Sequence, residues 1–184
     1  MSSDSHMRAR SLWRYTGEER PPFAQAPGPG QESVWDYPRP PRLVPDTREV
    51  VVLAGDVELV RTRRSLRMLE TGSPPTFYLP FADARLDLLV EGPQMRSSHC
   101  EWKGNAHYWS IISGELQLAD AAWWYPFPRT PYEAIADYFS AYPGRVACFV
   151  EGERVKAQEG AFYGGWVTAE LVGPWKGASG TSGW

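Results

Sequence analysis

From Tyr108 to Leu118 the chain reads Tyr-Trp-Ser-Ile-Ile-Ser-Gly-Glu-Leu-Gln-Leu. Two runs rich in aromatic and branched apolar residues flank a Gly-Glu pair, and this pattern is typical of two antiparallel strands joined by a tight turn. The same plan recurs over residues 50–60 and 146–155. Three hairpins predict an antiparallel sheet system, so we expect a mainly β fold.

The composition agrees with this expectation. A chain of 184 residues suffices for one globular domain. Its 17 Gly, 17 Pro and 9 Trp favour strands and turns over helices. The apolar runs are only a few residues long, far below the roughly 20 that span a bilayer, and no leader of charged and then apolar residues opens the chain. We therefore expect neither a membrane span nor a secretory signal.

The charge and the cysteine content limit the kinds of partner and the cellular compartment that we expect. The formal charge is −3, so the chain lacks the basic excess of a nucleic-acid-binding protein. The two cysteines, Cys100 and Cys148, do not form a Cys-x-x-Cys pair. Free thiols and a chain without a leader predict a location in the reducing cytoplasm.

The sequence divides into four regions. Residues 1–20 are polar and Arg-rich, and we expect them to be disordered. Residues 21–46 carry eight prolines and should form an extended arm along the surface, anchored by Trp35 and Tyr37. Residues 47–157 form the β-rich core domain. Residues 158–184 are rich in Gly and Trp and should form an ordered wrap; because an arm and a tail can embrace a second copy, a homodimer stays open.

One amphipathic helix is expected at about residues 131–142. Thr130-Pro131-Tyr132-Glu133 has the form of a capping box with Pro at the first helical position. Apolar residues then recur with helical spacing up to Tyr142, and Pro143-Gly144 ends the pattern. A single helix would therefore pack on the β core.

The segment from His99 to Trp109 is the densest in chemically active side chains. A lysine near a thiol favours the thiolate, so Lys103 could make Cys100 a nucleophile. His107 on the next strand could approach the thiol as well. The alternative is that Cys100 is a small buried apolar residue and Lys103 a surface turn residue.

Charged side chains outside this segment offer further candidates. Arg64 and Arg67 belong to an Arg cluster that could clamp a carboxylate or phosphate, or form a solvated strand edge. Glu70 could be a general base or an ion-pair partner of one of these arginines. The tripeptide Trp-Lys-Gly occurs at 102–104 and again at 175–177. It could mark two walls of one pocket, but coincidence is the simpler interpretation.

No metal or cofactor is expected. The three His and two Cys lack the paired spacing of a structural zinc site. The chain also lacks a phosphate-binding Gly-x-x-x-x-Gly-Lys loop, a dinucleotide-binding Gly motif and a Gly-x-Ser-x-Gly elbow.

Five motifs together resemble a bacterial family catalogued as domain of unknown function 427. They read Arg63-Arg64 with Leu69-Glu70, Pro74-Pro75-Thr76-Phe77-Tyr78-Leu79-Pro80, Asp83-Ala84-Arg85-Leu86-Asp87-Leu88-Leu89, Cys100-Glu101-Trp102-Lys103-Gly104-Asn105-Ala106-His107-Tyr108-Trp109 and Asp120-Ala121-Ala122-Trp123-Trp124-Tyr125-Pro126. The match covers about residues 47–157, and the arm and tail look like those of longer, actinobacterial-type members. Phe77 replaces the first Tyr of a Tyr-Tyr pair, and His107 occupies a position that is often small or polar.

The resemblance implies a β-tent-like fold, in which two sheets enclose a cleft, as in zinc-binding and methionine sulfoxide reductase B-type domains. The paired Cys ligands of those relatives are missing here, so only the architecture carries over. The family has also carried a nucleotidyltransferase label, for which this sequence holds no paired-Asp motif. The motif residues implied to line the cleft are Glu70, Tyr78, Cys100, Lys103, Tyr108, Trp109 and Trp123.

Two functions fit these residues. In an enzyme acting on a small molecule, Cys100 would be the nucleophile or redox thiol, Lys103 would stabilise a thiolate or an oxyanion, and Glu70 would move a proton. Trp109 and Trp123 would clamp a flat substrate. In a non-catalytic module, the same cleft would bind a metabolite or a partner peptide.

Overall fold

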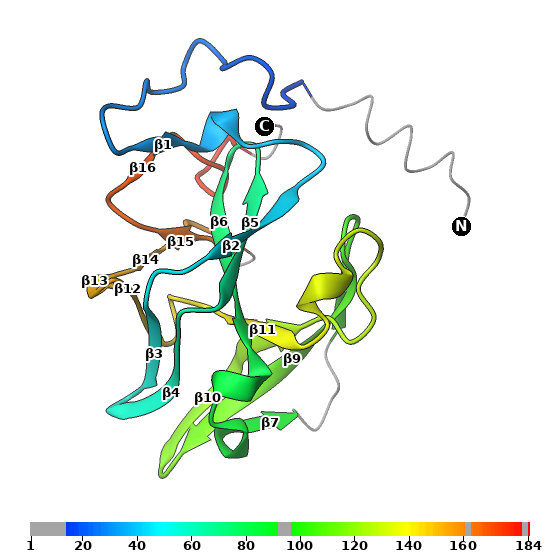
Figure 1. The fold of residues 1–184 in the computed structure, drawn as a ribbon, viewed down its shortest axis with the longest axis vertical. Helices are drawn as coiled ribbons and strands as arrows, with labels where there is room; N and C mark the ends of the chain where they lie inside the picture. Colours follow the sequence, from blue (N-terminus) through cyan, green and yellow to red (C-terminus); the bar gives the residue numbers. More distant parts are fainter. Residues whose placement is uncertain (1–13, 92–96, 161–162, 182–183) are drawn as a thin grey trace.

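The protein is described by a computed structural model that covers residues 14–91, 97–160, 163–181 and 184. Strands dominate it, and antiparallel sheets form its centre (Figure 1). The prediction of a mainly β fold is confirmed. Within the described residues, no helix is long and apolar enough to cross a membrane.

The larger sheet has eight strands. Its order is β2 (Arg42–Asp46), β5 (Ser65–Glu70), β6 (Ser73–Pro80), β11 (Tyr138–Ala141), β10 (Leu116–Trp124), β9 (Gly104–Ser113) and β7 (Leu89–Glu91), with β8 (Ser97–Cys100) paired to β9 as well. Each pairing in it is antiparallel.

The smaller sheets complete the β structure. A four-stranded sheet has the order β13 (Glu153–Arg154), β12 (Ala147–Val150), β3 (Val50–Ala54) and β4 (Val57–Thr62). Two pairs lie outside it: β14 (Lys156–Ala157) with β15 (Trp166–Val167), and β1 (Glu32–Ser33), which runs parallel to β16 (Leu171–Val172). Four short 3-10 turns connect strands, namely η1 (Val34–Asp36), η2 (Phe81–Asp83), η3 (Leu86–Leu88) and η4 (Glu133–Ile135).

All three hairpins expected from the sequence are present. β3 pairs with β4, β9 with β10 and β12 with β13. Gly55 and Gly114 adopt positive φ angles of 63° and 59° in the first two turns, which glycine does without steric cost. In the third turn Glu151 and Gly152 both have positive φ, as the tight type I′ hairpin turn requires.

The main core lies between the two larger sheets. Alternate residues of β3, including Val50 and Val52, point inward and are fully buried. They join Phe77 of β6, Ile111 of β9 and Phe139 of β11 in one apolar cluster. This cluster covers one face of the larger sheet. The candidate site described below lies on the other face.

The predicted helix at 131–142 is wrong. The structure has only the 3-10 turn η4 there, followed by strand β11. Thr130 and Glu133 do bond to each other through their side chains, but no α-helix follows. The backbone of β11 pairs with β10 on one side and β6 on the other, so sheet hydrogen bonds replace helical ones. The apolar spacing reflects packing of separate elements rather than one helix face.

The arm and the C-terminal segment pack together at one end of the molecule (Figure 1). Trp35 of η1 is 1% exposed, and its indole N–H donates to the Pro174 carbonyl at 2.7 Å. Tyr15 and Trp184 also contact the Trp35 ring. The expected disordered region, 1–20, thus includes described residues that contact the arm, while residues 1–13 lie outside the described part.

A charged network ties the arm to the larger sheet. The Arg67 guanidinium donates to both carboxylate oxygens of Glu32, at 3.1 and 2.7 Å, and the Tyr37 hydroxyl donates to the same carboxylate at 2.5 Å. Hydrogen bonding from Arg67 lowers the pKa of Glu32, burial opposes this effect, and Tyr37 adds to the lowering. A carboxyl with a lowered pKa in the folded state stabilises that state at neutral pH and loses this contribution as acid protonates it.

We therefore expect Glu32→Gln to lower the free energy of unfolding by about 1 kcal/mol at neutral pH, a value reduced because the carboxylate is partly exposed. The difference from the wild type should shrink as the pH falls below about 4.3, because there the unfolded chain takes up the proton before the folded protein does. Urea unfolding at several pH values measures it, with the exposed Glu18→Gln as control. An equal deficit at neutral and acidic pH would show that the charge plays no part.

Candidate functional site

A cavity of about 430 Å³ lies on the face of the larger sheet that is turned away from the main core. Side chains alternate along a strand, so Tyr108 of β9 and Trp123 of β10 point to this face. Thr76 of β6 lines the same cavity. The far wall comes from the C-terminal segment, including Gln158 and Lys176.

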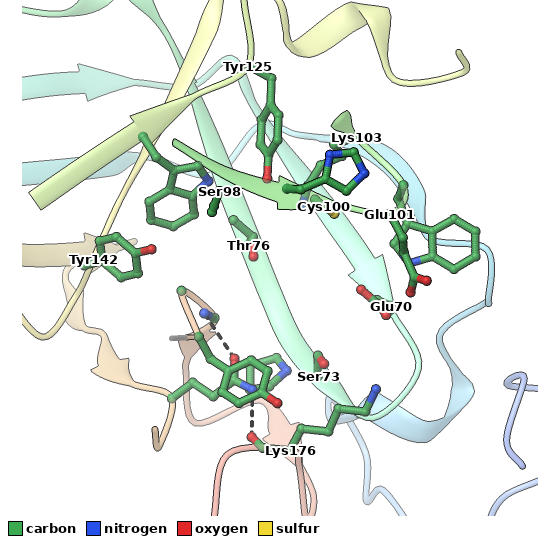
Figure 2. A pocket seen from close by; sticks show the side chains of 18 of the residues that line it. Glu70, Ser73, Thr76, Ser98, Cys100, Glu101, Lys103, Tyr125, Tyr142 and Lys176 are labelled. Atoms are coloured by element: carbon green, nitrogen blue, oxygen red, sulfur yellow. Dashed lines mark hydrogen bonds between the residues drawn. The ribbon is translucent and has the colours of Figure 1, made fainter. Parts of the chain in front are cut away.

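The three residues predicted to carry chemistry all line this cavity (Figure 2). Glu70 is the last residue of β5 and Cys100 the last residue of β8. Lys103 belongs to the turn between β8 and β9, where Cys100 pairs with Gly104. Gly104 has a φ of 100°, a conformation that favours glycine, and this sharp turn brings the lysine back beside the cysteine.

The Lys103 ammonium lies between aromatic rings. Its nitrogen is 5.6 Å from the centre of the Tyr78 ring and 5.3 Å from that of Tyr125, within range of a cation–π interaction. Burial opposes the charge, but the Tyr78 and Tyr125 phenols and the Cys100 thiol raise the pKa of Lys103 well above its ordinary value. Lys103 is therefore a cation at neutral pH.

Tyr78 lies behind Lys103, completely buried. Burial raises the pKa of its phenol, although Lys103 and Trp123 lie close enough to act in the opposite direction. Within the described residues, the Tyr78 hydroxyl has no hydrogen bond of standard geometry. Tyr78 does not line the cavity, so it acts on the site through Lys103, whose ammonium lies over its ring.

Glu70 lies at the rim and faces a buried arginine. Its carboxylate is 3.6 Å from the Arg39 guanidinium, whose side chain is 1% exposed. The sequence suggested Arg64 or Arg67 as its partner, whereas the arm supplies Arg39. Burial lowers the pKa of Arg39, and Glu70 and Glu101 raise it. The Glu70 carboxylate is therefore held in place, with 28% of its side chain exposed toward solvent.

Aromatic side chains form the apolar part of the lining. The rings of Trp123 and Tyr142 lie 4.3 Å apart and are tilted by 42°. The Tyr108 hydroxyl lies 2.7 Å from the Ser98 hydroxyl, a hydrogen bond that joins β9 to β8. Such a wall is suited to a flat or apolar part of a small molecule.

Five of the residues predicted to bind substrate do not line the cavity: Tyr78 is buried behind Lys103, and four others point elsewhere. Arg64 pairs with Asp83 at the surface, and Arg67 is occupied by Glu32. His107 and Trp109 alternate with Tyr108 on β9, so they point to the opposite face. There Trp109 packs against Phe81 and Trp124. These four residues are not part of the site that the geometry defines.

The C-terminal wall was missed as part of the site. The Gln158 side chain accepts from the Gly165 N–H at 3.1 Å and donates to the Lys176 carbonyl at 2.7 Å, and it thereby joins the two segments that form the wall (Figure 2). The repeated Trp-Lys-Gly tripeptide was the one sequence signal for Lys176. Both of its lysines, Lys103 and Lys176, line the cavity.

The described residues contain no group of three or more His, Cys, Asp or Glu placed to hold a metal ion. Both cysteines are free thiols, Cys148 deep in the core and Cys100 partly exposed. Burial raises the pKa of Cys148, so this thiol is the inert one of the two.

A mainly β domain with a thiol-, lysine- and tyrosine-lined cavity is thus the class of protein that fold and site define. The chain belongs to the family described as domain of unknown function DUF427, whose model, named NTP_transf_9, matches residues 42–152. A comparison with curated proteins finds no match. The matched region supplies Glu70, Cys100 and Lys103, and the wall at 158–176 lies beyond it.

Proposed function

We propose that this protein is an enzyme that transforms a small carbonyl compound with Cys100 as its nucleophile. The observation that supports the proposal is that Glu70, from the end of β5, and Cys100 with Lys103, from the turn between β8 and β9, line one cavity. A thiol without a nearby cation, or a cation that does not face a cavity, would not indicate a catalytic site.

The proposed step is an acyl transfer. The Cys100 sulfur attacks the carbonyl carbon, the electron pair of the C=O bond moves to oxygen, and the Lys103 ammonium stabilises this oxyanion. When the C=O bond re-forms, the leaving group departs and Cys100 carries the acyl group as a thioester. Glu70 at the rim takes the proton of the thiol or of the water that later hydrolyses the thioester.

The surroundings of Cys100 support the proposal. Trp123, Tyr108 and Tyr142 provide a wall for the flat or apolar part of the substrate. A reducing cytoplasm, the compartment that we propose, would keep Cys100 in the thiol form. A non-catalytic module that binds an anionic aromatic metabolite is the alternative, because the Lys103 cation and the aromatic wall would serve a bound carboxylate equally well.

A reaction with p-nitrophenyl acetate separates the two functions. We expect a burst of about one equivalent of p-nitrophenolate, with the acetyl group on Cys100 by peptide mass spectrometry. Cys100→Ser should abolish the burst, and Cys148→Ala, which removes only the buried thiol, should retain it. An acetyl group found only on other residues, or a burst that survives in Cys100→Ser, would leave the binding module as the function.

A further inference from the structure

The wall formed by the C-terminal segment carries a second cation into the cavity. Lys176 lies across the cavity from Lys103 (Figure 2), and its backbone N–H donates to the Gly72 carbonyl at 2.9 Å. With the Gln158 bond to its carbonyl, both backbone groups of Lys176 are fixed. These two hydrogen bonds therefore fix the position of Lys176 relative to the rest of the fold.

The wall is also tightly fitted to the rest of the site. A Cβ atom on Gly164 would lie 2.2 Å from the Trp123 indole, so the backbone here rests directly on the aromatic wall. A Cβ on Gly165 would lie equally close to the Gln158 amide oxygen. A side chain at either position would clash with these neighbours, so glycine is required for the close approach.

The Lys176 ammonium forms no ion pair within the residues that the structure describes. Burial lowers the pKa of Lys176, and the Arg39 guanidinium lowers it further, while Glu70 and Glu101 act in the opposite direction. This cation is thus partly desolvated and only partly neutralised. A bound anion would supply the negative charge that the surroundings of Lys176 lack.

The ion pairs around the cavity leave Lys176 available to one negative charge on the ligand. Arg39 is buried behind the lining and pairs with Glu70, and Lys103 is the cation beside Cys100, whereas no salt bridge within the described residues engages Lys176. A carboxylate carries one negative charge, whereas a doubly charged phosphate would also meet Glu70 and Glu101.

We infer that the substrate is a small carbonyl compound that also carries a carboxylate, and that Lys176 binds this carboxylate while the carbonyl group reaches Cys100 and Lys103. The inference rests on the proposed function for the reacting group, but the role of Lys176 can be measured without turnover. Substrate choice would then be set by residues beyond the matched family region of 42–152.

Two alkylating reagents of similar size provide the test. Iodoacetate and iodoacetamide both react when the Cys100 sulfur displaces iodide, but only iodoacetate carries a carboxylate. We expect Lys176→Gln to lower the ratio of the iodoacetate rate to the iodoacetamide rate at Cys100 about fivefold. Lys176→Arg should keep most of the ratio. Lys156→Gln, at an exposed lysine outside the cavity, should leave it unchanged.

The outcomes separate this inference from the proposed function. An unchanged ratio in Lys176→Gln, or equal slowing with both reagents, would overturn the role of Lys176 even if the p-nitrophenyl acetate burst occurs. A lowered ratio without any burst would support the anion site and reject the acyl transfer. Failure of both reagents to modify Cys100 would overturn both, because the thiol would then not be open to the cavity.

Discussion

Trp166→Ala should destabilise the protein by about 4 kcal/mol, because large-to-small changes of a buried aromatic residue cost about 3–5 kcal/mol. The Trp166 indole is fully buried and stacks on Phe77 with ring centres 4.9 Å apart. Its N–H donates to the Ala141 carbonyl at 3.0 Å, so the substitution also removes a buried hydrogen bond. The Trp166→Ala substitution leaves a cavity where the C-terminal segment packs against the main core.

Chemical denaturation of the wild type and of the variant measures this loss. Trp166→Phe, which keeps a ring but not the N–H donor, should lie between the two. Phe127→Ala provides the control, since this aromatic residue is 87% exposed and its loss should change the free energy of unfolding by less than about 0.5 kcal/mol. Equal midpoints for the wild type and Trp166→Ala would mean that the C-terminal segment does not depend on this contact.

The hairpins could be predicted because their signals are local. Each turn needs positive φ, and Gly55, Gly114 and Gly152 supply it beside apolar runs that fit strands. The helix prediction failed for the opposite reason. Tyr132, Ile135, Phe139 and Tyr142 have the spacing of a helix face, yet the backbone of β11 pairs with β10 and with β6, which is distant in sequence. Tertiary pairing of this kind overrides local preference.

Residues close in sequence were the part of the site that spacing alone could predict. Cys100 and Lys103 share one turn, so their proximity follows from the chain itself. Tyr108 and Trp109 were both expected in the cleft, but neighbouring residues of β9 point to opposite faces, and only Tyr108 lies there.

The residues that come from distant parts of the chain needed other signals. The family resemblance brought Glu70 and Trp123 into the prediction, and the repeated Trp-Lys-Gly tripeptide was the one signal for Lys176. No local pattern places Arg39, which the arm supplies.

We propose that Lys103 and Cys100 act as a pair in one cavity. Lys103→Met keeps an unbranched side chain to pack against the Tyr78 and Tyr125 rings but removes the charge that we propose stabilises a thiolate or an oxyanion. Lys103→Arg keeps the charge, and Lys156→Met removes a lysine at an exposed site outside the cavity. Together these variants separate the charge of Lys103 from its packing.

The most direct test is the rate at which iodoacetamide alkylates Cys100 at neutral pH. Peptide mass spectrometry measures this rate in the wild type and in the variants. The unfolding transition of each variant verifies that it is folded. Lys103→Met should react about tenfold more slowly than the wild type, which corresponds to about 1.4 kcal/mol. Lys103→Arg should retain most of the rate, and Lys156→Met should match the wild type. Equal rates in the wild type and a folded Lys103→Met would contradict the pairing of the two residues.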